Sequence, residues 1–152
     1  MPNYDYDKDL LIARECEKEV ADILTKYGIE ILGFEHTNKY DILTRVDGKE
    51  YTFEVKEDFT CERTGNVGLE FECRGRPSGI QVSKADYYIY KIHTKNDGIC
   101  FFLCKTSNLK NMIDAVEYFR VVNGGDRMSN SMNYLFEYTT FAKHAKLIAH
   151  YK

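Results

Sequence analysis

The chain contains 152 residues with a mass of 17.8 kDa, a length that fits one compact domain. Hydrophobic residues make up 43% of the sequence and charged residues 30%, a balance typical of globular proteins and too apolar for a disordered chain. The net charge of −3 at pH 7 excludes a protein that binds polyanions simply by being basic overall. Any contact with nucleic acid must therefore be local.

No repeat, low-complexity tract or proline-rich linker divides the chain, so we expect residues 1–152 to form a single domain. The charge is nevertheless uneven, because residues 1–56 hold eight basic and thirteen acidic side chains and the remainder is mildly basic. An acidic centre beside a basic remainder is one way to build a metal-dependent site for phosphates.

The amino-terminal residues are acidic and lack the basic and apolar regions of a signal peptide, and no apolar run is long enough to cross a bilayer. We therefore expect a cytoplasmic protein with no membrane partner. Five cysteines without a C-x-x-C pair indicate free thiols rather than a disulfide framework or a zinc site.

The first predicted element is an amphipathic helix over residues 8–27, with apolar side chains along one side and Gly28 as its stop. Short strands are predicted next, and Asp47-Gly48 is typical of a tight hairpin turn between the second and the third. These strands cover residues 30–35, 40–46 and 51–56.

Further strands are predicted over residues 67–73, 87–92 and 99–104, because apolar and polar residues alternate there or form short apolar runs. The sequence Arg-Gly-Arg-Pro-Ser-Gly over residues 74–79 predicts an exposed basic loop. The alternation around residues 87–92 favours core packing over base stacking for its aromatic side chains. The side chains expected on the core face of that strand are Tyr88, Tyr90 and Ile92.

Ser107 is expected to cap a helix that ends near Tyr118. A loop over residues 123–132 and a short strand from Tyr134 follow, and the tail beyond them is either helical or extended. The helix is expected to bury an apolar stripe made of Leu109, Met112, Ile113 and Val116.

The strand over residues 51–56 carries the first candidate site residues, because its alternation places Glu54 and Lys56 on one face. Asp41 opens the preceding strand, and the hairpin allows it to approach Glu54 across the sheet. Two carboxylates and an amine suit phosphodiester hydrolysis. Carboxylate oxygens bind Mg²⁺, which neutralises phosphate charge and lowers the pKa of a bound water, while the lysine orients or deprotonates that water.

The predicted first helix offers a third carboxylate. At 100° per residue, Glu17 borders the apolar side of the helix, whereas Glu15 and Glu19 are expected to face solvent. A carboxylate at the edge of a buried face needs a cation, a hydrogen bond or a metal ion as its partner. We expect the site formed by Asp41 and Glu54 to supply that partner.

Asp41, twelve intervening residues and Glu54-Val55-Lys56 on an alternating strand resemble the PD-(D/E)XK nuclease superfamily. Within it, the pattern is most similar to archaeal-type Holliday-junction resolvases, whose first helix carries a Glu at the spacing from its terminal Gly that Glu17 has from Gly28. Their Asp follows that Gly as Asp41 follows Gly28. Tyr40 stands where the motif often has Pro, and the chain lacks the strongly basic character of many resolvases.

A second run, Gly75-Arg76-Pro77-Ser78-Gly79-Ile80 leading to Ala85-Asp86-Tyr87-Tyr88, is similar to small phage-encoded nucleases of the same superfamily. The resemblance implies an α/β fold with a restriction-endonuclease-like core, in which an N-terminal helix precedes a central mixed β-sheet flanked by helices. It also implies a cytoplasmic enzyme, in the host cytoplasm if a phage encodes it, that takes part in DNA recombination.

For the site, the resemblance implies that Asp41 and Glu54 are metal ligands and that the Val55 carbonyl is a third ligand. Lys56 would position the nucleophilic water, and Glu17 would be an outer or second-metal ligand. The expected cofactor is Mg²⁺, with Mn²⁺ as a substitute. The expected partners are branched or structured DNA and a second copy of the chain, because a homodimer presents two symmetric sites to a junction.

The predicted loop after the fourth strand supplies candidate nucleic-acid contacts, because arginine and hydroxyl side chains bind phosphates without reading bases. These candidates are Arg74, Arg76, Ser78 and Lys84.

Three functions therefore remain open. The first is a Mg²⁺-dependent endonuclease that selects structured DNA, similar to the Holliday-junction resolvases. The second is an exonuclease, a nicking or restriction-type enzyme, or a ribonuclease of the same fold. The third is a non-catalytic nucleic-acid-binding protein that retains the fold.

Overall fold

The computed structural model describes residues 6–35, 39–124 and 130–152. Gly125, within the loop predicted over residues 123–132, lies outside them. The elements in chain order are α1 (Tyr6–Lys26), β1 (Glu30–Phe34), β2 (Ile42–Val46), β3 (Lys49–Asp58), α2 (Cys61–Thr64), β4 (Asn66–Cys73), β5 (Arg76–Pro77), the 3₁₀ turn η1 (Gly79–Gln81), β6 (Tyr87–His93), β7 (Ile99–Lys105), α3 (Thr106–Asp114), β8 (Arg120–Gly124), β9 (Ser131–Glu137), α4 (Tyr138–Lys143) and β10 (Lys146–Tyr151).

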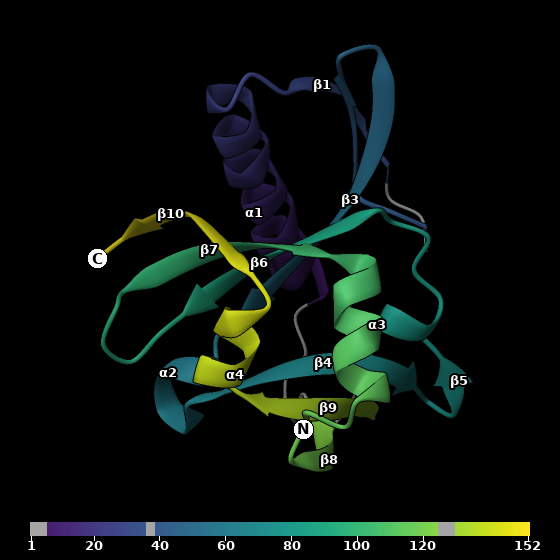
Figure 1. The fold of residues 1–152 in the computed structure, drawn as a ribbon, viewed down its shortest axis with the longest axis vertical. Helices are drawn as coiled ribbons and strands as arrows, with labels where there is room; N and C mark the ends of the chain where they lie inside the picture. Colours follow the sequence, from purple (N-terminus) through teal and green to yellow (C-terminus); the bar gives the residue numbers. More distant parts are fainter. Residues whose placement is uncertain (1–5, 36–38, 125–129) are drawn as a thin grey trace.

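The central sheet has six strands in the order β1-β2-β3-β6-β7-β10. Its neighbours are antiparallel except β3 and β6, which run parallel, so the sheet is mixed. With the N-terminal helix first and helices beside the sheet (Figure 1), this confirms the predicted α/β class.

The predicted hairpin between β2 and β3 is confirmed. Asp47 and Gly48 adopt φ values of 50° and 78°, the left-handed conformation that a type I′ turn requires at both central positions. The turn sets the register that pairs Ile42 with Phe53. Asp41 therefore lies directly beside the middle of β3.

A second sheet, with the order β5-β4-β9-β8, is not anticipated by the sequence analysis. It arises because parallel strands β3 and β6 need a crossover connection, and here that connection contains strand β4 in place of a long helix. Strand β9 comes back from late in the chain to pair with β4. The crossover thus becomes the centre of another layer, below the main sheet in Figure 1.

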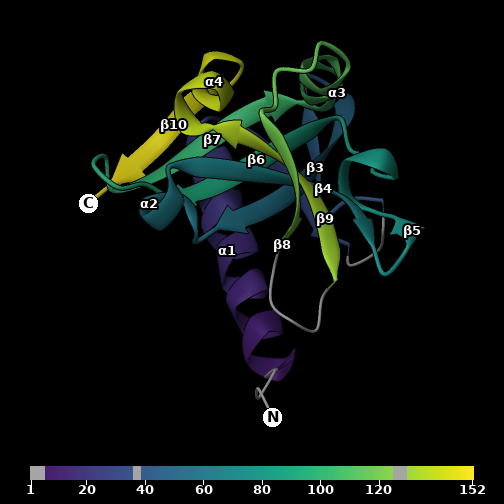
Figure 2. The ribbon, with the colours of Figure 1, turned by 90° about the horizontal axis from the view of Figure 1, so that it is seen from below.

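The two faces of the main sheet bury separate cores. On one face, α1 packs Val20 and Leu24 against Phe53 and Phe101. On the other face, Tyr88, Tyr90 and Ile92 are buried, as predicted, against side chains of the second sheet, α3 and α4. Figure 2 shows α3 and α4 on one side of the strands and α1 on the other.

The predicted boundaries of the second long helix are wrong. Helix α3 begins at Thr106 after extended Lys105, with no side-chain cap, and ends at Asp114. Val116 adopts φ 54°, which stops the helix, and its side chain is 63% exposed instead of buried. Leu109 and Met112 do lie in the core as expected.

The C-terminal tail, for which a helix and an extended segment were both open, contains one of each: α4 is followed by β10 at the edge of the main sheet. Part of the predicted basic loop is a short strand, because Arg76 and Pro77 pair with the end of β4. As expected, none of the five cysteines, all of which lie in the described ranges, takes part in a disulfide. None of the described helices is both long and apolar enough to span a membrane.

Phe136 on β9 provides a test of the second sheet as part of the core, because its side chain is fully buried. We expect Phe136→Ala to lower the free energy of unfolding by about 3–5 kcal/mol, through lost burial and the cavity left behind. Phe119→Ala, at a half-exposed position, should cost less than about 1 kcal/mol. Urea denaturation of both variants measures the difference, and equal losses would contradict the packing described.

Candidate active site

Strand β3 has an open edge where β2 ends. The pairing of β2 with β3 stops at Phe53, whereas β6 accompanies β3 as far as Asp58. Asp41 lies at this point, because its N–H donates to the Phe53 carbonyl (2.9 Å) and its own carbonyl accepts from the Glu35 N–H (2.8 Å). Its carboxylate Oδ2 accepts a hydrogen bond from the Val55 N–H at 2.8 Å. The Asp41 side chain therefore continues the ladder where the strand no longer does.

Glu54 and Lys56 follow on the face of β3 that looks toward the second sheet. Their side chains form an ion pair, with Lys56 Nζ 3.6 Å from Glu54 Oε1. The Glu54 side chain is only 15% exposed and that of Lys56 is 38% exposed. Among the described residues, none donates a hydrogen bond to the buried Oε2 of Glu54.

Burial raises the pKa of Glu54 from an ordinary value of 4.5 to about 7. Lys56 opposes this shift by favouring the carboxylate, while the negative charges of Asp41 and Glu17 add to it. The structure thus brings the predicted residues Asp41, Glu54 and Lys56 together, with Glu17 within electrostatic range. Because the pKa of Glu54 is raised, a cation that binds its carboxylate would displace the carboxyl proton.

Glu17 reaches the site from the opposite side of the sheet. Helix α1 packs on the face that carries Phe53, and Glu17 is 5% exposed there. Together with Val55 and Lys56 it lines a hollow of about 420 Å³ between α1 and β3. Its expected burial is confirmed, and its cationic partner in the structure is Arg14, at 3.1 Å.

Glu15 is exposed, as expected, and the side chain of Glu19 is 38% exposed but also has partners on the sheet. Glu19 forms an ion pair with the buried ammonium group of Lys91 on β6 and accepts a hydrogen bond from the Tyr151 hydroxyl. Lys91 also lies 3.4 Å from Glu57, which in turn contacts His93 at 2.8 Å. The helical wheel missed this contact because a long lysine side chain on the sheet reaches the rim of α1.

The donor set at the open edge suits a hard divalent cation, since Asp41 and Glu54 supply carboxylate oxygens beside the Val55 backbone. The buried Glu54 Oε2, which receives no donor from the described residues, is the atom that a cation would satisfy. Across residues 6–35, 39–124 and 130–152, no three acidic, histidine or cysteine side chains form a group spaced for a metal ion. A cation here would therefore need ligands beyond side chains, such as the Val55 carbonyl or water.

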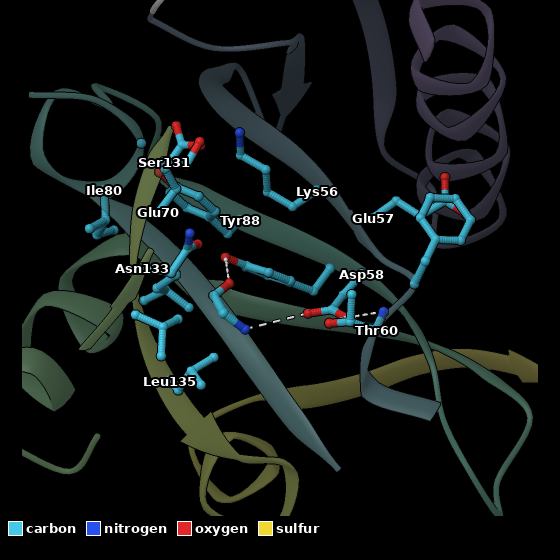
Figure 3. Close-up of a pocket in the computed structure, with 16 residues that line it drawn as sticks. Lys56, Glu57, Asp58, Thr60, Glu70, Ile80, Tyr88, Ser131, Asn133 and Leu135 are labelled. Carbon is cyan, nitrogen blue, oxygen red and sulfur yellow. Dashed lines mark hydrogen bonds between the residues drawn. The ribbon is translucent and has the colours of Figure 1, made fainter. Parts of the chain in front are cut away.

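A pocket of about 340 Å³ opens beside this edge, between β3 and the second sheet. Figure 3 shows Lys56 pointing to the pocket side of β3 and Glu57 pointing the other way, toward α1. Glu70 on β4 and Asn133 on β9 also line it. No motif predicted these two residues, because only the tertiary pairing of β4 with β9 places them opposite Lys56.

The candidate nucleic-acid contacts occupy two places. Arg74 and Arg76 are exposed at the tip formed by β4 and β5. Lys84 is exposed too, and its N–H donates to the Lys39 carbonyl at 3.3 Å, two residues before Asp41. Ser78 is half-buried and donates to Glu70 at 2.9 Å, so its hydroxyl supports the pocket wall.

Comparisons with protein-family models, with curated proteins and with solved structures find no match to this chain.

The Glu54 environment predicts an unusual titration. Carbon-13 NMR of the side-chain carboxyl should give a pKa near 7. Asp41→Asn should lower this pKa because a negative charge is removed, and Lys56→Met should raise it because the compensating cation is lost. A Glu54 titration that neither substitution moves would contradict the described proximity.

The same shift predicts how stability depends on pH. The folded protein holds the Glu54 proton up to about pH 7, whereas the unfolded chain releases it near 4.5, so the free energy of unfolding should fall as pH rises through that interval. Glu54→Gln should abolish this decrease in the free energy of unfolding, which amounts to about 3 kcal/mol over the interval. Urea denaturation at several pH values measures this, and an unchanged profile in the variant would contradict it.

Proposed function

We propose that this protein is a metal-dependent nuclease that hydrolyses phosphodiester bonds in DNA, at the open edge of β3. The observation that carries the proposal is the convergence of Asp41, Glu54 and Lys56, through the 2.8 Å hydrogen bond from Val55 to Asp41 and the 3.6 Å pair between Lys56 and Glu54. Two carboxylates and an ammonium group beside a groove form a site suited to phosphoryl chemistry.

The metal-binding roles proposed for the chain follow from this arrangement. Asp41, Glu54 and the Val55 carbonyl would hold Mg²⁺ or Mn²⁺, with Glu17 as an outer group. The bound ion would neutralise phosphate charge and lower the pKa of a coordinated water. Lys56, more exposed than Glu54, donates hydrogen bonds to the attacking water or to a phosphate oxygen. Asp41 accepts the hydrogen bond that holds the backbone of Val55 in place, and its carboxylate would also be a ligand of the ion.

The substrate proposal is structured DNA, as for a Holliday-junction resolvase, within a restriction-endonuclease-like core. The exposed cations Arg74, Arg76 and Lys84 support a local approach of the phosphate backbone, since the net charge of −3 provides no general attraction. A homodimer would present two such sites to a symmetric junction. Exonuclease, nicking or ribonuclease activity and a non-catalytic binding role are the competing outcomes of the test below.

The proposal is tested by cleavage of end-labelled four-way junction, flap, single-stranded and linear duplex DNA, and of RNA, with Mg²⁺ or Mn²⁺. We expect metal-dependent cutting with a preference for the branched DNA. Asp41→Asn and Lys56→Ala should each lower the rate at least about 100-fold, because each removes a group that acts on the reacting phosphate or water.

Matched controls come from the neighbouring hairpin. Asp47→Asn and Lys49→Ala change the same residue types at exposed positions, and they should leave the rate unchanged. Cutting that survives both site substitutions, or no cutting of any substrate, would overturn the proposed activity. Preferential cutting of RNA or of free ends would instead select the second class of enzyme.

A further inference from the structure

Most residues that line the pocket beside Lys56 have no role in the proposed hydrolysis. Its main-sheet wall carries Tyr88 and Tyr90, and its opposite wall is formed by β4, β8 and β9. Its volume of about 340 Å³ lies at the lower end of the range of roughly 300–1,000 Å³ found for small-ligand pockets. A single planar group fits such a space, whereas a duplex does not.

The wall from the second sheet presents a polar pair. Glu70 and Asn133 are direct partners in the ladder between β4 and β9, so their side chains stand next to each other on one face. Figure 3 shows both side chains at the pocket, with Lys56 at the same end as Glu70. A carboxylate accepts from amino and imino N–H groups, while a carboxamide both donates and accepts. Together they match the mixed hydrogen-bonding edge of a nucleobase.

Small and apolar residues shape the rest of that wall. Gly68 allows the Asn133 side chain to lie against the backbone of β4, since a Cβ at this position would lie only 3.3 Å from Asn133 Oδ1. Gly79 allows the chain to pass against β4, because a Cβ there would meet the Glu70 carbonyl oxygen at 2.1 Å. Ile80 and Leu135 add apolar surface. Aromatic and apolar walls around a few polar groups are typical of pockets that receive an extruded base.

We propose that this pocket binds one unpaired nucleobase of the substrate strand, next to the phosphate that Lys56 contacts. The inference rests on the proposed nuclease function and deepens it, because it names the feature that the enzyme would select. Lys56 lines both the base pocket and the hollow beside Glu17, so a base held by Glu70 and Asn133 would place its own phosphate at the open edge of β3. Single-stranded flaps and mismatched sites offer such unpaired bases at little cost, whereas a regular duplex must be opened.

The test measures binding without cleavage. Nitrogen-15-labelled protein in a buffer without divalent metal is titrated with the four 2′-deoxynucleoside 5′-monophosphates and, separately, with 2-deoxyribose 5-phosphate and inorganic phosphate. We expect at least one nucleotide to shift the backbone resonances of Gly68 and Leu135, and the two base-free phosphates to leave them in place. Asn133→Leu, which keeps the size and removes the amide, should weaken this binding about tenfold.

Asn123→Leu is the matched control, because Asn123 is exposed on β8 and does not line the pocket. It should bind the nucleotides as the wild type does, and thermal melting of both variants shows that they fold. No shift at Gly68 and Leu135, equal shifts with the base-free phosphates, or unchanged affinity in Asn133→Leu would overturn the base pocket. Because this assay needs no catalysis, nucleotide binding without cleavage would refute only the nuclease, and cleavage without nucleotide binding would refute only the pocket.

Discussion

The hydrogen bond from the Val55 N–H to the Asp41 carboxylate is the contact on which the site depends. It forms because β2 stops pairing at Phe53 while β3 continues beside β6. In an interior strand this N–H would donate to a carbonyl of the neighbouring strand, and at a solvent-exposed edge it would donate to water. Here a side chain takes it. The same contact holds a carboxylate beside the backbone that carries Glu54 and Lys56.

The second sheet gives this edge its chemical environment. Strand β4 belongs to the crossover that parallel pairing requires, and β9 joins it from a part of the chain more than fifty residues later. Their outer face closes one side of the pocket, while their inner face packs into the core with α3 and α4. Glu54, next to this pocket on β3, is mostly buried, and burial raises its pKa to about 7. A carboxylate that is costly to ionise gains most from a nearby cation.

Charge is divided between the two faces of the main sheet. On the α1 face, Glu19 and Glu57 share Lys91 as their ion-pair partner, and Arg14 pairs with Glu17. On the other face, Lys56 is the cation closest to Glu54 in the described ion pairs. The alternation of β3 separates these groups: Glu57 belongs to a structural network behind the strand, and Lys56 faces the pocket. Adjacent residues thus serve stability and the proposed chemistry separately.

Local patterns were enough to predict α1, the β2–β3 hairpin and the shared face of Glu54 and Lys56, because helix period, strand period and turn conformation depend on neighbouring residues. They were also enough to place Asp41 near Glu54, since one tight turn sets that register. Local patterns did not predict that the helix begins at Thr106 and ends at Asp114. Its C-terminal end differs because Val116 adopts a left-handed backbone conformation that helix propensity does not predict. Only the tertiary structure reveals the second sheet, the Lys91 ion pairs and the pairing of Glu70 with Asn133. Each of these joins segments that are far apart along the chain, and contacts of that kind produce no periodic pattern in the sequence.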